Sequence, residues 1–225
     1  MTDARTHIAA PENKPGYSLA LKIAAQLFSV VFHPLFIPTY VIAFLLRFHP
    51  SYFSGFSDGS KLMLLLTTIL NTAFFPAFSV LIMKGLGFIS SILLPTRQDR
   101  IGPYLAAMIF YFWAARVFFK FVPQLSPELP SFMTGVFITT IFALLANIFF
   151  KISMHAIGCG GLIGIFIVVM NSNTMLMTWP LALAILVTGM VCTARFVVSN
   201  HTQKEIYSGL LVGLACQLIA ALIIL

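Results

Sequence analysis

The sequence predicts an all-α integral membrane protein, a bundle of six or seven transmembrane helices. Of its 225 residues, 60% are hydrophobic and only 8% are charged, whereas an ordinary soluble domain has about 25% charged residues. Apolar runs close to the ~20 residues that cross a bilayer recur along the chain. Because backbone polar groups in lipid must be hydrogen-bonded within their own segment, these runs are expected to be helices.

The N-terminal part predicts a polar tail over residues 1–17, followed by a single helical domain over 18–225. The first apolar run, 18–46, is longer than the core of a signal peptide, and no cleavage signal precedes it. Two prolines at 34 and 38 predict that this membrane segment is kinked or broken. His33 precedes the first proline. It is either a functional polar group at membrane depth or a partner for carbonyls freed by the kink.

Further apolar segments complete the predicted bundle. They cover residues 62–83, 103–121, 131–150, 156–170, 175–193 and 206–225. All three cysteines lie inside apolar runs without metal-type spacing, so we expect them to be buried small side chains.

The net charge of +7 comes from basic residues that are dispersed and mostly flank the apolar runs. This distribution is typical of membrane borders and of anionic lipids or substrates. We therefore expect no nucleic-acid partner.

Three polar clusters fall on one membrane face when the crossings are counted from the second span onward. They are Arg97, Asp99 and Arg100, then Lys151, Ser153 and His155, then Arg195, His201 and Glu205. A random scatter of flanking charges is not expected to produce this convergence, so the sequence predicts a site there.

The last cluster has the chemistry of a histidine nucleophile. His201 and Glu205 are four residues apart, so at a helix start they share a face. A carboxylate on one imidazole nitrogen fixes the tautomer and leaves the other nitrogen free to attack. Arg195 supplies a guanidinium suited to a phosphate.

This cluster resembles the third motif of the type 2 phosphatidic acid phosphatase (PAP2) superfamily. That motif is Ser-Arg, five residues, His, three residues, Asp, and then a helix punctuated by glycines. Arg195 and His201 match it, and glycines follow at 209 and 213. Ala194 stands where the family has Ser, and Glu205 stands where it has Asp.

The second cluster resembles the family's Pro-Ser-Gly-His motif at a helix start. Ser153 and His155 match, whereas Ile152 and Met154 replace Pro and Gly. The resemblance implies that His155 is a general acid for the leaving oxygen and that Ser153 helps to hold the phosphate.

The first cluster matches the family's Lys, six residues, Arg-Pro motif only in residue type. The segment from Arg97 to Pro103 has basic residues and a proline, but not that spacing. Only the role of phosphate charge neutralisation carries over, to Arg97 and Arg100, with Asp99 as a candidate to position one of them. An interfacial anchor is the alternative.

The resemblance implies a metal-independent lipid phosphatase or pyrophosphatase without a cofactor. In that mechanism His201 attacks phosphorus to form a phosphohistidine, and His155 protonates the leaving group. Arg195, Ser153, Arg97 and Arg100 stabilise the charge on phosphorus-bound oxygens. Phosphatidic acid, phosphatidylglycerol phosphate or a polyprenyl diphosphate are the expected substrates.

Other functions remain open. A lipid phosphotransferase would use the same site, and an inactive relative is compatible with the substitutions. A transporter or channel is the alternative from a different class, because prolines and polar residues interrupt the spans.

The expected location is the inner membrane of a bacterium, with the site outside the cytoplasm. Nine basic residues fall on the site's face against four opposite, which by itself favours a cytoplasmic site. That bias is smaller when the three candidate phosphate ligands, Arg97, Arg100 and Arg195, are set aside. Bacterial members of the resembled family usually act on the outer leaflet, and we therefore expect the site outside the cytoplasm.

Overall fold

The protein is an α-helical bundle that spans the membrane. The computed structural model describes residues 16–120, 124–172, 178–199 and 201–225, and the regular structure in these ranges is entirely helical. Six helical spans are long and apolar enough to cross a bilayer. They are Asp58–Gly85 (α3, η2 and α4), Arg97–Lys120 (α5), Glu128–Phe149 (α6), Met154–Ser172 (α7), Thr178–Val198 (α8) and Gln203–Ile224 (α9). The prediction of an all-α membrane bundle is confirmed, whereas residues 1–15 of the expected tail lie outside the described ranges.

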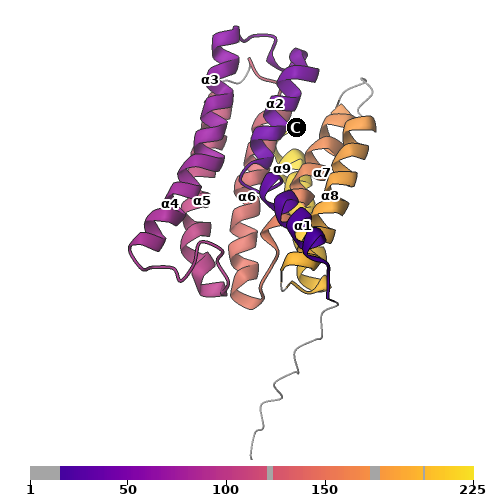
Figure 1. Cartoon of the computed structure of the whole chain (residues 1–225). Helices are drawn as coiled ribbons and strands as arrows, with labels where there is room; N and C mark the ends of the chain where they lie inside the picture. The colour runs from indigo at the N-terminus through magenta and orange to yellow at the C-terminus, as the bar shows by residue number, and fades with distance from the viewer. Residues whose placement is uncertain (1–15, 121–123, 173–177, 200) are drawn as a thin grey trace, which may run out of the picture.

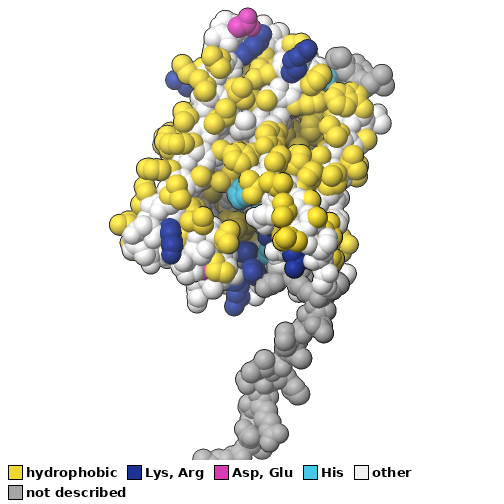
Figure 2. Space-filling model, in the orientation of Figure 1, with side chains coloured by type: hydrophobic (Ala, Val, Ile, Leu, Met, Phe, Trp, Pro, Cys, Tyr) yellow, Lys and Arg dark blue, Asp and Glu magenta, His cyan; other side chains and the backbone are white. Residues whose placement is uncertain are grey.

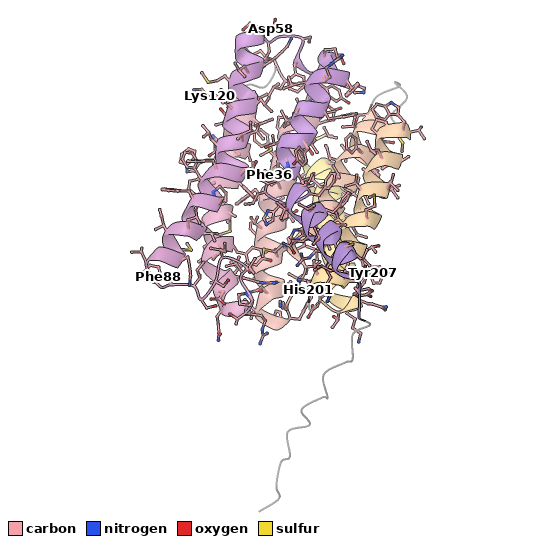
Figure 3. All side chains as sticks on the ribbon, viewed as in Figure 1. Phe36, Asp58, Phe88, Lys120, His201 and Tyr207 are labelled. Atoms are coloured by element: carbon pink, nitrogen blue, oxygen red, sulfur yellow. The ribbon has the colours of Figure 1, made fainter. Side chains whose placement is uncertain are left out.

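The first apolar segment consists of two half-helices, α1 (Leu19–Val31) and α2 (Ile37–Phe48). Figure 1 shows α1 in the lower half of the bundle and α2 in the upper half, and Figure 3 places Phe36 between them at mid-height. The break follows from Pro34, which has no amide hydrogen. The amide of His33 bonds to the Val30 carbonyl at 3.2 Å, which leaves the Ser29 carbonyl without a helical partner.

A second interruption lies inside the next span. Between α3 (Asp58–Ile69) and α4 (Phe75–Gly85), residues Leu70–Phe74 form a π-helical turn, η2. The Phe75 amide donates to the Leu70 carbonyl, five residues back. This widened turn precedes Pro76, which cannot donate a backbone hydrogen bond, so the span continues past the proline.

Two predicted boundaries are wrong in an informative way. Helix α5 begins at Arg97 rather than at 103, because Thr96 and Asp99 cap it reciprocally: the Asp99 amide donates to Thr96 Oγ1 at 3.1 Å, and the Thr96 amide donates to Asp99 Oδ2 at 3.4 Å. Helix α8 continues to Val198 rather than ending at 193. Arg97 and Arg100 therefore lie in the first turn of a helix, and Arg195 lies near the end of one.

Helices α7 and α9 approach each other closely through glycines. A Cβ atom on Gly213 would lie 2.0 Å from the Ile157 carbonyl oxygen, and one on Gly160 would lie 2.1 Å from the Leu210 carbonyl oxygen. Such contact between backbones requires small residues. It brings the starts of α7 and α9 together, where the Ser153 amide donates to the Glu205 carbonyl at 3.2 Å.

The surface is that of a membrane protein. Figure 2 shows Lys and Arg side chains toward the two ends of the visible face and a broad hydrophobic band between them. A histidine interrupts this band at mid-height, at the edge of a hollow (Figure 2).

Candidate active site

The predicted polar residues gather at one end of the bundle, where α7 and α9 begin and α8 ends. Figure 3 places His201 at this end together with Phe88, and it places Asp58 and Lys120 at the opposite end. The start of α1 also lies at the His201 end (Figure 1).

His201 is oriented by Glu205 at the start of α9. Its Nδ1 lies 2.8 Å from Glu205 Oε2. Because a carboxylate only accepts, Nδ1 carries the proton and Nε2 of the neutral ring has a free lone pair. The same carboxylate oxygen accepts from the Thr202 amide at 3.1 Å, and Thr202 Oγ1 accepts from the Glu205 amide at 3.3 Å. This reciprocal cap fixes the carboxylate, which in turn fixes the imidazole.

The surroundings of His201 favour the neutral imidazole. Only 9% of the residue is exposed. Burial, together with the nearby positive charges of Arg100 and Arg195, lowers the pKa of His201, although the hydrogen bond and charge of Glu205 act in the opposite direction. A neutral, oriented imidazole is the form that can act as a nucleophile.

Arg195 has unused hydrogen-bonding capacity. Its Nε atom is buried and has no hydrogen-bond partner among the described residues. Its positive charge is close enough to His33, His155 and His201 to act on all three. A buried donor without a partner is costly, and an anion bound between these groups would satisfy it.

Arg100 and Lys151 add positive charge on the same side. Arg100 is buried, and it donates from Nε to the Leu94 carbonyl at 3.1 Å and from Nη1 to the Ile152 carbonyl at 2.7 Å. Leu94 has a φ of 51°, a strained value for a bulky side chain. Burial and the charge of Arg100 lower the pKa of Lys151. Sequence reasoning assigned Lys151 no role, although its position two residues before Ser153 was a usable signal.

Ser153 holds the helices of the site together and does not line its surface. It is fully buried, and its Oγ accepts from the Ala156 amide at 3.5 Å, which caps the start of α7. Its own amide binds the Glu205 carbonyl. Ser153 therefore joins α7 to α9 beneath His201.

His155 faces the break between α1 and α2. Its Nε2 lies 3.0 Å from the Ser29 carbonyl oxygen, the carbonyl that the break leaves free. Because a carbonyl only accepts, Nε2 carries a proton and Nδ1 is the nitrogen open to another partner. The sequence offered this carbonyl-binding role to His33, but the structure gives it to His155. The Val31 carbonyl accepts from the Tyr40 hydroxyl at 2.8 Å.

Arg97 and Asp99 form hydrogen bonds away from His201. Arg97 Nη1 donates to the carbonyls of Ile148 and Phe149, both at 2.9 Å, so it caps the end of α6. Asp99 binds Ser90 and Thr96, and no arginine in the described ranges donates to its carboxylate. The structure thus brings together His201, Glu205, Arg195, His155 and Arg100, with Ser153 beneath them, and shows Arg97 bound to α6.

No family model, curated protein or solved structure matches the chain. Within the described ranges, no three His, Cys, Asp or Glu side chains form a group that could hold a metal ion.

Proposed function

We propose that this protein is a lipid phosphatase or pyrophosphatase of the bacterial inner membrane, acting through a phosphohistidine on His201. The observation that carries the proposal is the oriented His201–Glu205 pair close to three cationic side chains. Of these, Arg195 keeps a donor that no described residue binds. The resemblance of the same residues to the third PAP2 motif also supports it.

The proposed reaction begins with attack by His201 Nε2 on phosphorus. The Nε2–P bond forms as the bond from phosphorus to the leaving oxygen breaks, and His155 supplies the proton for that oxygen. Since Nε2 of His155 is bound to the Ser29 carbonyl, the transferred proton comes from Nδ1. The negative charge of the bound phosphate favours that protonated form.

Arg195, Arg100 and Lys151 supply the charge stabilisation. Together they carry three positive charges against the single carboxylate of Glu205, an excess that suits a phosphate dianion. Water then attacks the phosphohistidine with His155 accepting its proton, inorganic phosphate leaves, and His201 is regenerated.

Phosphate release by the purified protein tests this function. Phosphatidic acid, phosphatidylglycerol phosphate and polyprenyl mono- and diphosphates form the panel, with His201→Ala protein as the background. We expect release from at least one lipid that the variant abolishes. Transfer of the phosphate to a second lipid instead of water identifies a phosphotransferase.

Transport is a second candidate function, favoured by one observation. A cavity inside the bundle is lined by residues from both helix interruptions, Pro34 and Pro76, and broken helices at such a position are common in transporters. Uptake of a labelled lipid phosphate analogue into proteoliposomes, without hydrolysis, is the result that favours transport.

We further propose that the site faces away from the cytoplasm. Thr202, beside His201, and Asp58 are both exposed, and His201 and Asp58 lie at opposite ends (Figure 3). Single cysteines at these positions, in a variant lacking Cys159, Cys192 and Cys216, can be labelled on intact cells with an impermeant reagent. Labelling at Thr202→Cys alone supports this orientation, and labelling at Asp58→Cys alone reverses it.

A further inference from the structure

The break between α1 and α2 frees a buried carbonyl oxygen that an unbroken helix would use. In a regular helix the Ser29 carbonyl would accept from the His33 amide, but that amide bonds to the Val30 carbonyl at 3.2 Å. Pro34, the next residue, has no amide hydrogen to offer. Ser29 is only 2% exposed, so its carbonyl needs a partner from inside the protein.

His155 of α7 is that partner. Its Nε2 lies 3.0 Å from the Ser29 carbonyl oxygen, and the neutral ring therefore has its proton on Nε2 and its lone pair on Nδ1. The His33 ring packs edge-on against the His155 ring, with the centroids 5.0 Å apart. The hydrogen bond fixes the tautomer of His155, and the ring contact restricts its rotation.

Gly158 allows α7 to approach the break this closely. It lies one turn beyond His155, and a Cβ atom on it would lie 3.0 Å from Pro34 Cβ and 3.2 Å from Pro34 Cα. Gly161, one turn further along α7, is packed less tightly, since a Cβ atom there would meet Gln217 at 3.8 Å, an ordinary contact distance. The contact of His155 with α1 therefore depends on the missing side chain of Gly158.

The two histidines of the site are held through opposite nitrogens. Glu205 holds His201 through Nδ1, whereas the Ser29 carbonyl holds His155 through Nε2. The bond from the Ser153 amide to the Glu205 carbonyl keeps the starts of α7 and α9 together. Each ring thus has one nitrogen fixed by the protein and the other available for chemistry.

We propose that the α1–α2 break positions the general acid of the reaction, with Pro34 and Gly158 as the positioning residues. This inference rests on the proposed function. Because Nε2 is held, His155 gives its proton to the leaving oxygen from Nδ1 and later takes a proton from the attacking water at the same nitrogen. Helices α1 and α2 precede the stretch from 97 to 213 that resembles the PAP2 family, so this part of the site comes from outside the resemblance.

Pro34→Ala tests the source of the free carbonyl. The new amide lets α1 continue, so the His33 amide should return to the Ser29 carbonyl and displace His155. Pro38→Ala is the matched control, because Pro38 lies in the first turn of α2, where an amide has no helical partner to lose.

The measurement is a nitrogen NMR spectrum of the purified protein with isotope-labelled histidine rings. The His155 signals are assigned by their loss in His155→Gln. We expect the proton of neutral His155 on Nε2 in wild type and Pro38→Ala, and a mixture of the two tautomers in Pro34→Ala.

Gly158→Ala tests the effect on catalysis, with Gly161→Ala as the matched control. Both variants gain the same helix propensity on α7, but only Gly158→Ala pushes Pro34 away. The substrates are the lipid phosphomonoester of the panel that wild type hydrolyses fastest and para-nitrophenyl phosphate, whose leaving oxygen needs no proton. The rate constant compared is kcat/KM, which reports the steps up to release of the leaving group.

The two substrates should respond differently to Gly158→Ala. We expect kcat/KM to fall by about tenfold for the lipid, because a small misplacement of a catalytic group is costly. We expect a fall of less than about twofold for para-nitrophenyl phosphate, because acid catalysis matters little for a good leaving group. Gly161→Ala should leave both values within about twofold of wild type.

The outcomes separate the two levels of the proposal. An unchanged His155 tautomer in Pro34→Ala, or equal losses on the two substrates in Gly158→Ala, overturns the positioning role while the phosphatase function stands. A loss in Gly161→Ala equal to that in Gly158→Ala also overturns it. Absence of phosphate release from every lipid in the panel overturns the proposed function itself, whichever tautomer His155 has.

Discussion

The α4–α5 connection and the α8–α9 connection place charged residues at the same end of the bundle and use them differently. Both precede a helix that begins with a reciprocal cap, Thr96 with Asp99 and Thr202 with Glu205. In the first, the Asp99 carboxylate is held by Ser90 and Thr96, and Arg97 caps α6.

In the α8–α9 connection, the same kind of reciprocal cap also orients a reactive side chain. Glu205 caps its helix and also holds His201. Arg195 retains a buried donor without a partner in the described part of the chain. Arg97 therefore has a structural role at the end of α6, whereas Arg195 keeps a donor for a ligand.

The largest expected effect is at the nucleophile. His201→Ala should reduce phosphate release to the level of protein-free controls, because it removes the imidazole nitrogen that forms the covalent intermediate. The melting temperature of the purified variant, compared with that of wild type, checks that the bundle is intact. Ordinary turnover in His201→Ala contradicts the assignment.

The two capping carboxylates allow a matched comparison. Glu205→Gln should lower kcat by about 100-fold, since general-base and orientation effects of this kind contribute ~10²–10⁴-fold. Asp99→Asn should leave kcat within about threefold and lower the free energy of unfolding by about 1 kcal/mol, the usual cost of a weakened cap. If the two variants have similar kcat values, the carboxylate of Glu205 does not orient His201.

The two arginines provide the next comparison. Arg195→Lys should lower kcat/KM by about tenfold, because lysine keeps the charge but loses the planar fork that binds a phosphate at two points. Arg97→Lys should change kcat/KM by less than about twofold, since its bonds are to backbone carbonyls of α6. Similar losses in both variants show that Arg97 contacts the substrate after all.

The smallest expected effect is on pH dependence. Protonation of His201 removes its attacking lone pair, and its pKa lies below the usual value of about 6.5. The rate should therefore be lost only as the pH falls below that value. Glu205 raises this pKa, so Glu205→Gln should move the acid limb to still lower pH. A rate profile that moves to higher pH in this variant contradicts the described surroundings of His201.

The fold was largely predictable because hydrophobic length and helix breakers act locally. Pro34 and Pro76 predict the two helix interruptions, because proline has no amide hydrogen. The start of α5 was missed because its reciprocal cap lies in a stretch whose polarity resembles a loop. Hydropathy alone does not detect such a cap.

The site was predictable only in part, because tertiary hydrogen bonds decide which charges stay available. The i, i+4 spacing of His201 and Glu205 was sufficient to predict their contact. Nothing local distinguishes Arg97, which binds α6, from Arg195, whose Nε is bound by no described residue. The roles of His33 and His155 depend on the approach of α1–α2 to Gly158, a packing contact between segments distant in sequence.

The most direct test of the central claim is to trap the intermediate. Wild-type protein is mixed with a lipid diphosphate labelled in its terminal phosphate, quenched within milliseconds in alkali, and digested to locate the label. We expect an acid-labile, alkali-stable phosphate on the peptide containing His201, absent from His201→Ala and present in Asp99→Asn. Phosphate release without label on the protein, or the same label in His201→Ala, contradicts it.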